Sequence, residues 1–287
     1  MFESPICSGS SSVVISDTPR ISTLLEKGSG AANEDELLIG IKTYGVFDGA
    51  TSLVAESYSN GRSGGKMAAD ICKAAFSDES RGLQLAAVAA NQAIREEYCD
   101  AGITLHRKEE LWSCSAAVVR LSENSFDWCQ IGDCQIVVIR EDGSSLVLGR
   151  TPDQDVETLQ RWKEKTVHSD ESVMETMSRE ILEVRRRTNI DFGVFNGEPA
   201  ALKFLQNGTV SLSGVKDIVL FSDGLLLPQT DPGALPDWEH FIALYREGGL
   251  KEIRNYVRML QLRDITCRNY PRFKIHDDIS GIALSFK

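Results

Sequence analysis

The sequence has few of the features that mark membrane proteins or nucleic-acid-binding proteins. Its longest run without Asp, Glu, Lys or Arg is 13 residues, which is too short for a membrane-spanning helix. Acidic residues exceed basic residues by 42 to 31, and the net charge of -11 opposes binding to phosphate backbones and anionic membranes. We therefore expect no nucleic-acid partner and no membrane partner, whereas an acidic surface suits divalent cations.

Cysteine and histidine are too scattered to indicate a disulfide framework or a zinc site. The seven cysteines include no C-x-x-C pair, their number is odd, and the four histidines lie far apart. Residues Met1–Ser12 have neither a basic region nor a strong apolar core, so we expect no signal peptide. This pattern predicts buried, reduced thiols and a cytoplasmic location.

The remaining composition is that of an ordinary globular protein, with 42% hydrophobic and 25% charged residues in 287. Apolar periodicity predicts short strands joined by tight turns, together with longer amphipathic helices. The predicted strands include Leu37–Phe47, Ser115–Leu121, Ser125–Ile131, Gln135–Arg140, Ser145–Leu148, Asp217–Phe221 and Ile279–Phe286. The predicted helices are Ser52–Phe76, Leu83–Tyr98, Asp155–Arg187, Trp238–Tyr245 and Leu250–Leu262, and Asn207-Gly208 is predicted to be a hairpin turn. Because strands and helices do not alternate as βαβ units, we predict an α+β fold with antiparallel sheets.

An aspartate beside a small residue lies next to an apolar strand at four places. These aspartates are Asp48, Asp133, Asp223 and Asp277, and a fifth acidic pair, Glu34-Asp35, precedes the first of the strands. Carboxylates that converge at strand ends repel one another, and a bound divalent cation relieves that repulsion. Mg²⁺ and Mn²⁺ prefer such oxygen ligands, and two ions can activate a water and neutralise a phosphoryl group. A single Asp-Gly after a strand usually forms only a turn, so the prediction depends on the whole set.

Six short motifs, in a fixed order from Asn33 to Leu284, resemble those of the PPM family, the metal-dependent protein phosphatases of 2C type. The motifs are Asn33-Glu34-Asp35, Gly45-Val46-Phe47-Asp48-Gly49, Ser113-Cys114-Ser115-Ala116-Ala117-Val118, Ile131-Gly132-Asp133-Cys134, Phe221-Ser222-Asp223-Gly224 and Asp277-Asp278-Ile279-Ser280. Each motif alone is weakly specific, and the ordered set is strongly specific.

The resemblance implies a fold, a metal centre and a reaction. The fold would be an αββα sandwich of two antiparallel sheets flanked by helices, formed by residues 1–287 as a single domain with a variable flap at about 150–190. The reaction would be hydrolysis of phosphoserine or phosphothreonine in a phosphoprotein by a metal-bridging water, without a phosphoenzyme. The cofactor would be Mn²⁺ or Mg²⁺, as two ions with a third, weaker one. By position, Asp48, Asp223 and Asp277 resemble direct ligands, Gly49 offers its carbonyl, Glu34 and Asp35 hold metal-bound waters, and Asp133 shares the third ion with Asp223.

Two positions depart from the family pattern. Gly30 stands where many members carry an arginine that grips the phosphate, and Lys27 and Arg62 are the candidate substitutes. Ala50 replaces the histidine that resembles a general acid for the leaving group, and His276 is a candidate for that role.

These departures keep two other functions open. The chain would be a pseudophosphatase that serves as a binding or regulatory module, or a hydrolase of small phosphate esters. The flap also contains the run Arg185-Arg186-Arg187, which either attracts an acidic phosphopeptide or is a solvated helix end, and a solvated end is the favoured interpretation. The sequence gives no indication of oligomeric state.

Overall fold

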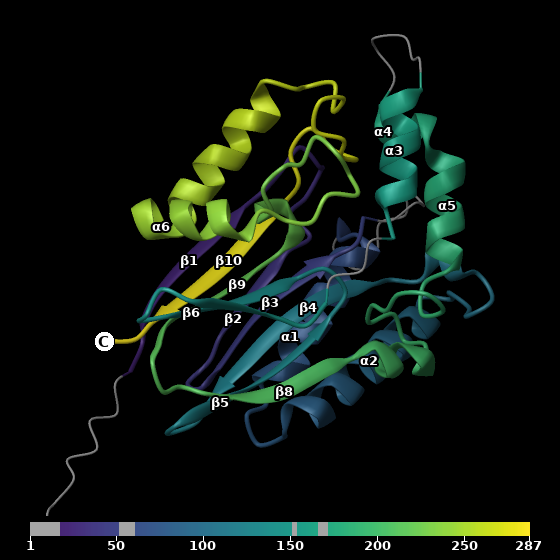
Figure 1. Ribbon diagram of the computed structural model, residues 1–287. Helices are drawn as coiled ribbons and strands as arrows, with labels where there is room; N and C mark the ends of the chain where they lie inside the picture. Colours follow the sequence, from purple (N-terminus) through teal and green to yellow (C-terminus); the bar gives the residue numbers. More distant parts are fainter. Residues whose placement is uncertain (1–17, 52–60, 151–153, 166–171) are drawn as a thin grey trace, which may run out of the picture.

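Two five-stranded antiparallel sheets pack face to face in the computed structural model, which describes residues 18–51, 61–150, 154–165 and 172–287 (Figure 1). Sheet A has the strand order β1-β10-β9-β6-β7, and sheet B has the order β2-β3-β4-β5-β8. The strands are β1 (Arg20–Glu26), β2 (Glu36–Ile39), β3 (Thr43–Gly49), β4 (Cys114–Leu121), β5 (Ser125–Ile131), β6 (Gln135–Arg140), β7 (Ser145–Leu148), β8 (Gln206–Ser211), β9 (Val215–Phe221) and β10 (Ile279–Ser285). This arrangement confirms the predicted α+β class and the sandwich of two antiparallel sheets.

Alternating residues in each strand separate the core between the sheets from the cores under the helices. In β9, Ile218 and Leu220 belong to the cluster between the sheets, whereas Val219 and Phe221 pack under the helix that covers sheet A. Opposite faces of a strand carry successive side chains, so one apolar strand contributes to two cores. The continuous buried apolar run Ile218–Phe221 of β9 follows from this double role.

Helices form the outer layers of the sandwich. The helices are α1 (Gly64–Ser77), α2 (Leu83–Asp100), α3 (Val156–Glu164), α4 (Val173–Thr176), α5 (Ser178–Arg186) and α6 (Trp238–Leu262), with short 3-10 turns η2 (Lys108–Glu110), η3 (Pro199–Phe204) and η4 (Asp223–Leu225). The pair α1 and α2 covers sheet B, and α6 covers sheet A (Figure 1). None of the helices in the described ranges has both the length and the apolar character needed to cross a membrane.

The flap differs from the single charged helix predicted over Asp155–Arg187. Three helices, α3, α4 and α5, stand together beside the sandwich (Figure 1), and residues 166–171 between α3 and α4 lie outside the described residues. Trp162, Val173, Met177 and Ile181 pack with Cys267 in a small cluster separate from the main cores. The prediction was wrong because it followed helical propensity, which is continuous through the segment. A new helix in fact begins after Ser172, whose side chain caps it by accepting a hydrogen bond from Glu175 N at 3.2 Å.

Four other details correct the sequence-based expectations. Asn207-Gly208 is not a turn but lies inside β8, where Gly208 faces Trp128 of β5 and a side chain there would meet the indole. Strand β1 was not predicted because most of its residues are exposed at a sheet edge. The helix predicted from Ser52 begins at Gly64, and residues 52–60 lie outside the described part of the chain. Cys99 is exposed, although five other described cysteines are buried as predicted.

The two helices predicted at the C-terminal end are joined in α6, with a break at Gly248 and Gly249. Gly249 has a φ of 67°, which a glycine adopts without steric cost, so the chain changes direction there. The separate helical patterns on the two sides of this glycine pair are therefore confirmed.

Asp264 organises the turn that leads from α6 towards β10. Its buried carboxylate accepts hydrogen bonds from the backbone N–H of Arg268 and Tyr270 and pairs with Arg272 at 2.9 Å. Burial opposes ionisation, but these donors outweigh burial and hold the pKa of Asp264 below its usual value. The turn positions Phe273 and the residues after it.

We expect Asp264→Asn to lower the free energy of unfolding by about 3 kcal/mol at pH 7, because Arg272 then loses its buried partner. Because the folded-state pKa is lowered, the stabilisation is present above the unfolded value near 4 and is lost as pH falls through the folded value. Denaturant unfolding at pH 7 and below pH 4 checks this, with the exposed turn residue Asp142→Asn as the control. A loss that is equal at both pH values would contradict it.

Candidate metal centre

Acidic residues from four distant segments meet at one end of the sandwich. Asp48 lies at the end of β3, Asp133 follows β5, Asp223 follows β9, and Asp277 precedes β10. All four line one cavity of about 150 Å³, together with Gly49. The strand ends that were predicted to converge therefore do converge, and five of the seven predicted metal residues surround a single space, whereas Glu34 and Asp35 are not among its lining residues.

Glycine allows two of these segments to approach closely. Gly132 has a φ of 78°, and this left-handed turn directs the chain from β5 to Asp133. A Cβ atom on Gly49 would lie 2.3 Å from the carbonyl oxygen of Gly65, so only glycine lets the start of α1 pack against the end of β3. The turn at Gly132 and the close approach at Gly49 thus bring both segments to the edge of the cavity.

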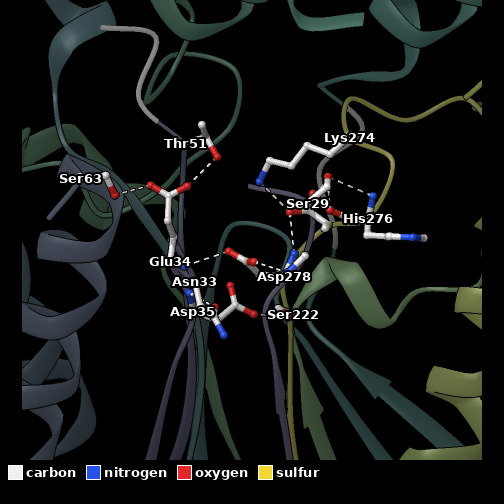
Figure 2. A network of polar contacts seen from close by, with 12 residues as sticks. Ser29, Asn33, Glu34, Asp35, Thr51, Ser63, Ser222, Lys274, His276 and Asp278 are labelled. Atoms are coloured by element: carbon white, nitrogen blue, oxygen red, sulfur yellow. Dashed lines mark hydrogen bonds and ion pairs between the residues drawn. The ribbon is translucent and has the colours of Figure 1, made fainter. Parts of the chain in front are cut away.

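The acidic pair Glu34-Asp35 lies beside the cavity and is fixed by hydroxyl donors (Figure 2). Glu34 accepts a hydrogen bond from Thr51 at 2.6 Å and another from the hydroxyl of Ser63. Asp35 accepts a hydrogen bond from Ser222 at 2.7 Å. Both carboxylates are buried, and neither has an ion pair within the described part of the chain.

Asp278 connects the segment before β10 to the loop before β2, beside the same cavity. Its carboxylate accepts the backbone N–H of Gly28 at 2.7 Å and that of Glu34 at 2.8 Å (Figure 2). The loop that carries Glu34 and Asp35 is thereby fixed to the residue that follows Asp277. This role of Asp278 was not predicted from the sequence, although the motif Asp277-Asp278 contained the residue.

Mutual repulsion disturbs the ionisation of these carboxyl groups. Burial, together with Asp277 and Asp223, raises the pKa of Asp35 to about 7, although the hydroxyls of Ser222 and Ser280 oppose the shift. Burial and the neighbouring carboxylates also raise the pKa of Asp48 well above its usual value. The same causes raise the pKa values of Asp133 and Asp223. These groups therefore need a positive charge in order to ionise together at neutral pH.

Lys274 supplies part of that charge. Its ammonium lies 2.7 Å from Asp277 (Figure 2), and it lines the cavity. Burial would lower the pKa of Lys274, but Asp277, Asp48 and Glu34 outweigh burial and raise it above the usual value. One lysine does not balance four aspartates, so the cluster retains an excess of negative charge.

The donor set fits Mg²⁺ or Mn²⁺. Asp48, Asp133, Asp223 and Asp277 offer carboxylate oxygens, which hard divalent cations prefer. The Cys134 thiol lies near Asp48 and Asp133, with ligand atoms within 4.8 Å of one another. Burial and the adjacent carboxylates raise the pKa of Cys134 well above its usual value, so its sulfur stays protonated and is a poor ligand.

Three predicted residues lie outside this cavity. Lys27 is exposed and donates to the carbonyl of Ala31 at 3.3 Å. Arg62 pairs with Asp70 at 2.7 Å. The ring of His276 contacts Gln261 at 2.9 Å and points away from Glu34 and Asp35 (Figure 2). These three residues are not among those that line the cavity.

Two residues of the flap line the cavity, and the prediction did not place them there. Asp155, just before α3, and Arg185, near the end of α5, face the aspartates of the sandwich. The run Arg185-Arg186-Arg187 was noted in the sequence as a cationic segment, but sequence alone does not show which of the three arginines turns inward.

The sequence profile of the family described as protein phosphatase 2C matches residues 28–263. The chain belongs to this family, and the predicted resemblance is confirmed. No curated protein sequence matches the chain closely enough to count as a relative.

Solved structures of bacterial phosphatases have the same fold. The serine/threonine phosphatase PstP of Mycobacterium tuberculosis is 17% identical, with a TM-score of 0.59, 94% of this chain covered and 99% of the other. A second PstP structure, of the catalytic domain in complex with two manganese ions, is 18% identical, with a TM-score of 0.58 and coverages of 93% and 98%. RsbX in complex with magnesium is 12% identical, with a TM-score of 0.50 and coverages of 93% and 94%.

Family and site together define the chemistry. The chain is a metal-dependent serine/threonine protein phosphatase of the 2C family, which acts on phosphoproteins. Two of the structures with the same fold contain manganese or magnesium. The predicted function, enzyme class and cofactors are confirmed, and a pseudophosphatase is not favoured.

We expect a metal-free protein to lose stability as pH rises. The folded-state pKa values of Asp35, Asp48 and Asp223 are raised, so their contribution is fully present below about pH 4 and is lost as pH rises through the folded values, about 7 for Asp35. In EDTA the Tm should fall between pH 5 and pH 8. Saturating Mn²⁺ should remove the fall and stabilise by about 2.7 kcal/mol at 100 times its Kd.

Asp223→Asn is the matched control for this measurement, because it removes one charge without changing the size of the side chain. Its Tm in EDTA should depend less on pH, and its shift with Mn²⁺ should be smaller. The same pH dependence with and without Mn²⁺ would show that the carboxylates do not bind the ion.

Proposed function

We propose that Asp48, Asp223 and Asp277, with the carbonyl of Gly49, hold two divalent cations, and that Asp133 and Asp223 hold a third. The observation that carries the proposal is the convergence of these carboxylates on one cavity from separate strand ends. When bound, the cations supply an acidic water that attacks phosphorus and positive charge that neutralises the phosphoryl oxygens.

Other residues of the site support that reaction by holding carboxylates and a loop in position. Glu34 and Asp35 present carboxylate oxygens that would hold water beside the two cations. The hydroxyls of Thr51, Ser63 and Ser222 fix the orientation of these carboxylates. Asp278 prevents the loop of Glu34 from moving away from β10. These positions favour a substrate phosphate that enters the cavity between the sandwich and the flap.

The cavity supports direct attack by water rather than a covalent intermediate. No histidine is among the described residues that line it, so Ser113 and Ser115 lack the base that activates a serine nucleophile. The pKa of the neighbouring Cys114 thiol is raised well above its usual value by burial and Cys72, which suppresses the reactive thiolate.

The domain limits and the location of the protein stay predictions. A single domain over residues 1–287, with a flap at about 150–190, is supported by the pairing of β1 with β10, which joins strands from opposite ends of the chain. A cytoplasmic location is supported by the five buried cysteine thiols.

We expect Asp223→Asn to lower metal-dependent hydrolysis of a phosphoserine peptide by about 100-fold or more, since even indirect changes around a metal cost 10- to 100-fold. Phosphate release is measured with a titration of Mn²⁺ and with EDTA. Asp142→Asn, in an exposed turn, controls for the loss of a carboxylate elsewhere. A fully active Asp223→Asn would contradict the proposed ligands, and hydrolysis of p-nitrophenyl phosphate alone would favour a small phosphate ester as substrate.

We expect Ala50→His to help alkyl esters more than aryl esters. Ala50 lines the cavity and has no proton to donate, and general acid catalysis contributes about 10²- to 10⁴-fold. A phosphoserine leaving group needs that proton, whereas p-nitrophenolate does not. The ratio of kcat values for the two substrates checks this, with Ala50→Asn as a polar control. An equal change on both substrates would contradict the idea.

A further inference from the structure

The three consecutive arginines of the flap have different surroundings. Arg186 pairs with Glu109 at 3.7 Å, Arg187 pairs with Asp191, and both side chains are more than half exposed. Arg185 is half-buried and lines the cavity of the aspartates. The interpretation as a solvated helix end therefore holds for two of the arginines and is wrong for Arg185.

Arg185 reaches the site without being neutralised there. Its guanidinium donates to the hydroxyl of Ser113 and to the carbonyl of Thr51, both at 3.2 Å. It forms no ion pair with any carboxylate of the described residues, although Asp155 and Glu34 lie within electrostatic range. Two neutral acceptors at long distance leave donors of the guanidinium fork for an anion.

The end of α5 is held firmly enough for the arginine to have a defined position. Asn189, which follows the helix with a φ of 58°, is buried and bonds Asn196 at 2.6 Å. The carbonyl of Thr188 accepts a bond from Lys108 at 3.0 Å, and that lysine also pairs with Glu198 at 2.9 Å. The flap is thus fixed to the sandwich next to Arg185.

The cation that the family pattern places before the acidic pair has no equivalent in this cavity. Gly30 has no side chain there, and neither Lys27 nor Arg62 lines the space. Lys274 does line it, but its ammonium is bound to Asp277. Among the described cations, Arg185 is the one that both faces the aspartates and lacks an anionic partner.

We propose that Arg185, delivered by the flap, binds the phosphate group of the substrate between its guanidinium and the ions held by the aspartates. The proposal rests on the proposed function, because it assigns phosphate recognition to the same cavity. A planar guanidinium forms two parallel hydrogen bonds to a phosphate dianion, which a lysine ammonium does not. The flap would then be part of substrate binding rather than an accessory surface.

The test compares Arg185→Gln with Arg186→Gln, which removes the same charge one residue further along α5. Binding of inorganic phosphate to the Mn²⁺-loaded full chain is measured by calorimetry, and KM is measured with a phosphoserine peptide. We expect Arg185→Gln to weaken phosphate binding and raise KM by about 10- to 100-fold, because bonds to a charged group are lost. Arg186→Gln should match the unchanged chain, and Arg185→Lys should be intermediate.

Binding of Mn²⁺ without phosphate separates this role from a structural one. Arg185→Gln should bind Mn²⁺ at least as tightly as the unchanged chain, since a positive charge near the ligands has been removed. Weaker Mn²⁺ binding, or phosphate binding equal to that of Arg186→Gln, would overturn the proposal. The unchanged chain separates the two proposals: if it lacks metal-dependent hydrolysis, the proposed function fails, whereas activity with no effect of Arg185→Gln refutes the role of the arginine alone.

Discussion

Repulsion between buried carboxylates is the interaction on which the rest of the site depends. Asp48, Asp133, Asp223 and Asp277 share one small cavity, and Lys274 balances only part of their charge. Burial penalises each charge, and every neighbouring carboxylate increases that penalty. Gathering these aspartates does not by itself favour folding. If each aspartate lay in a separate exposed turn, its carboxylate would stay hydrated. A divalent cation bound there, as proposed, would supply the missing stabilisation, and its binding energy would contribute to the folded state.

The sandwich can sustain this repulsion because the carboxylates lie at the ends of strands that pack on both faces. Phe221 precedes Asp223 by two residues and stacks on Phe241 of α6 at 4.7 Å. Phe47 precedes Asp48 and packs with Phe76 of α1. Asp48 and Asp223 are therefore each close in sequence to an anchored aromatic side chain, and these two carboxylates cannot separate without disrupting a core. At the edge of the cluster, hydroxyl and backbone donors hold the carboxylates of Glu34, Asp35 and Asp278 in place.

The sequence predicted features that are set by the pattern along one segment. It predicted less well the roles of residues that depend on contacts between distant segments. The strand-end aspartates and the alternating strands were predicted because both follow from periodicity along one segment. Lys274 and Asp278 were missed as parts of the site, since their roles depend on contacts with residues about 240 positions away or with the cavity itself. Asn207-Gly208 was misread because a turn dipeptide also fits opposite Trp128 in an edge strand. Local pattern does not distinguish these cases.

The flap shows why such a site gains from a segment with its own small core. Trp162, Met177 and Ile181 pack with Cys267, so the flap is attached to the turn after α6 as well as to the sandwich. That attachment sets α5 opposite the aspartates, and the side chain of Arg185 then spans the remaining distance. A cation on a strand of the sandwich would lie among the ligands and would compete with the ions. A cation on a separate element can meet a phosphate without pairing with a ligand, as Lys274 does with Asp277, although its charge still opposes that of the ions.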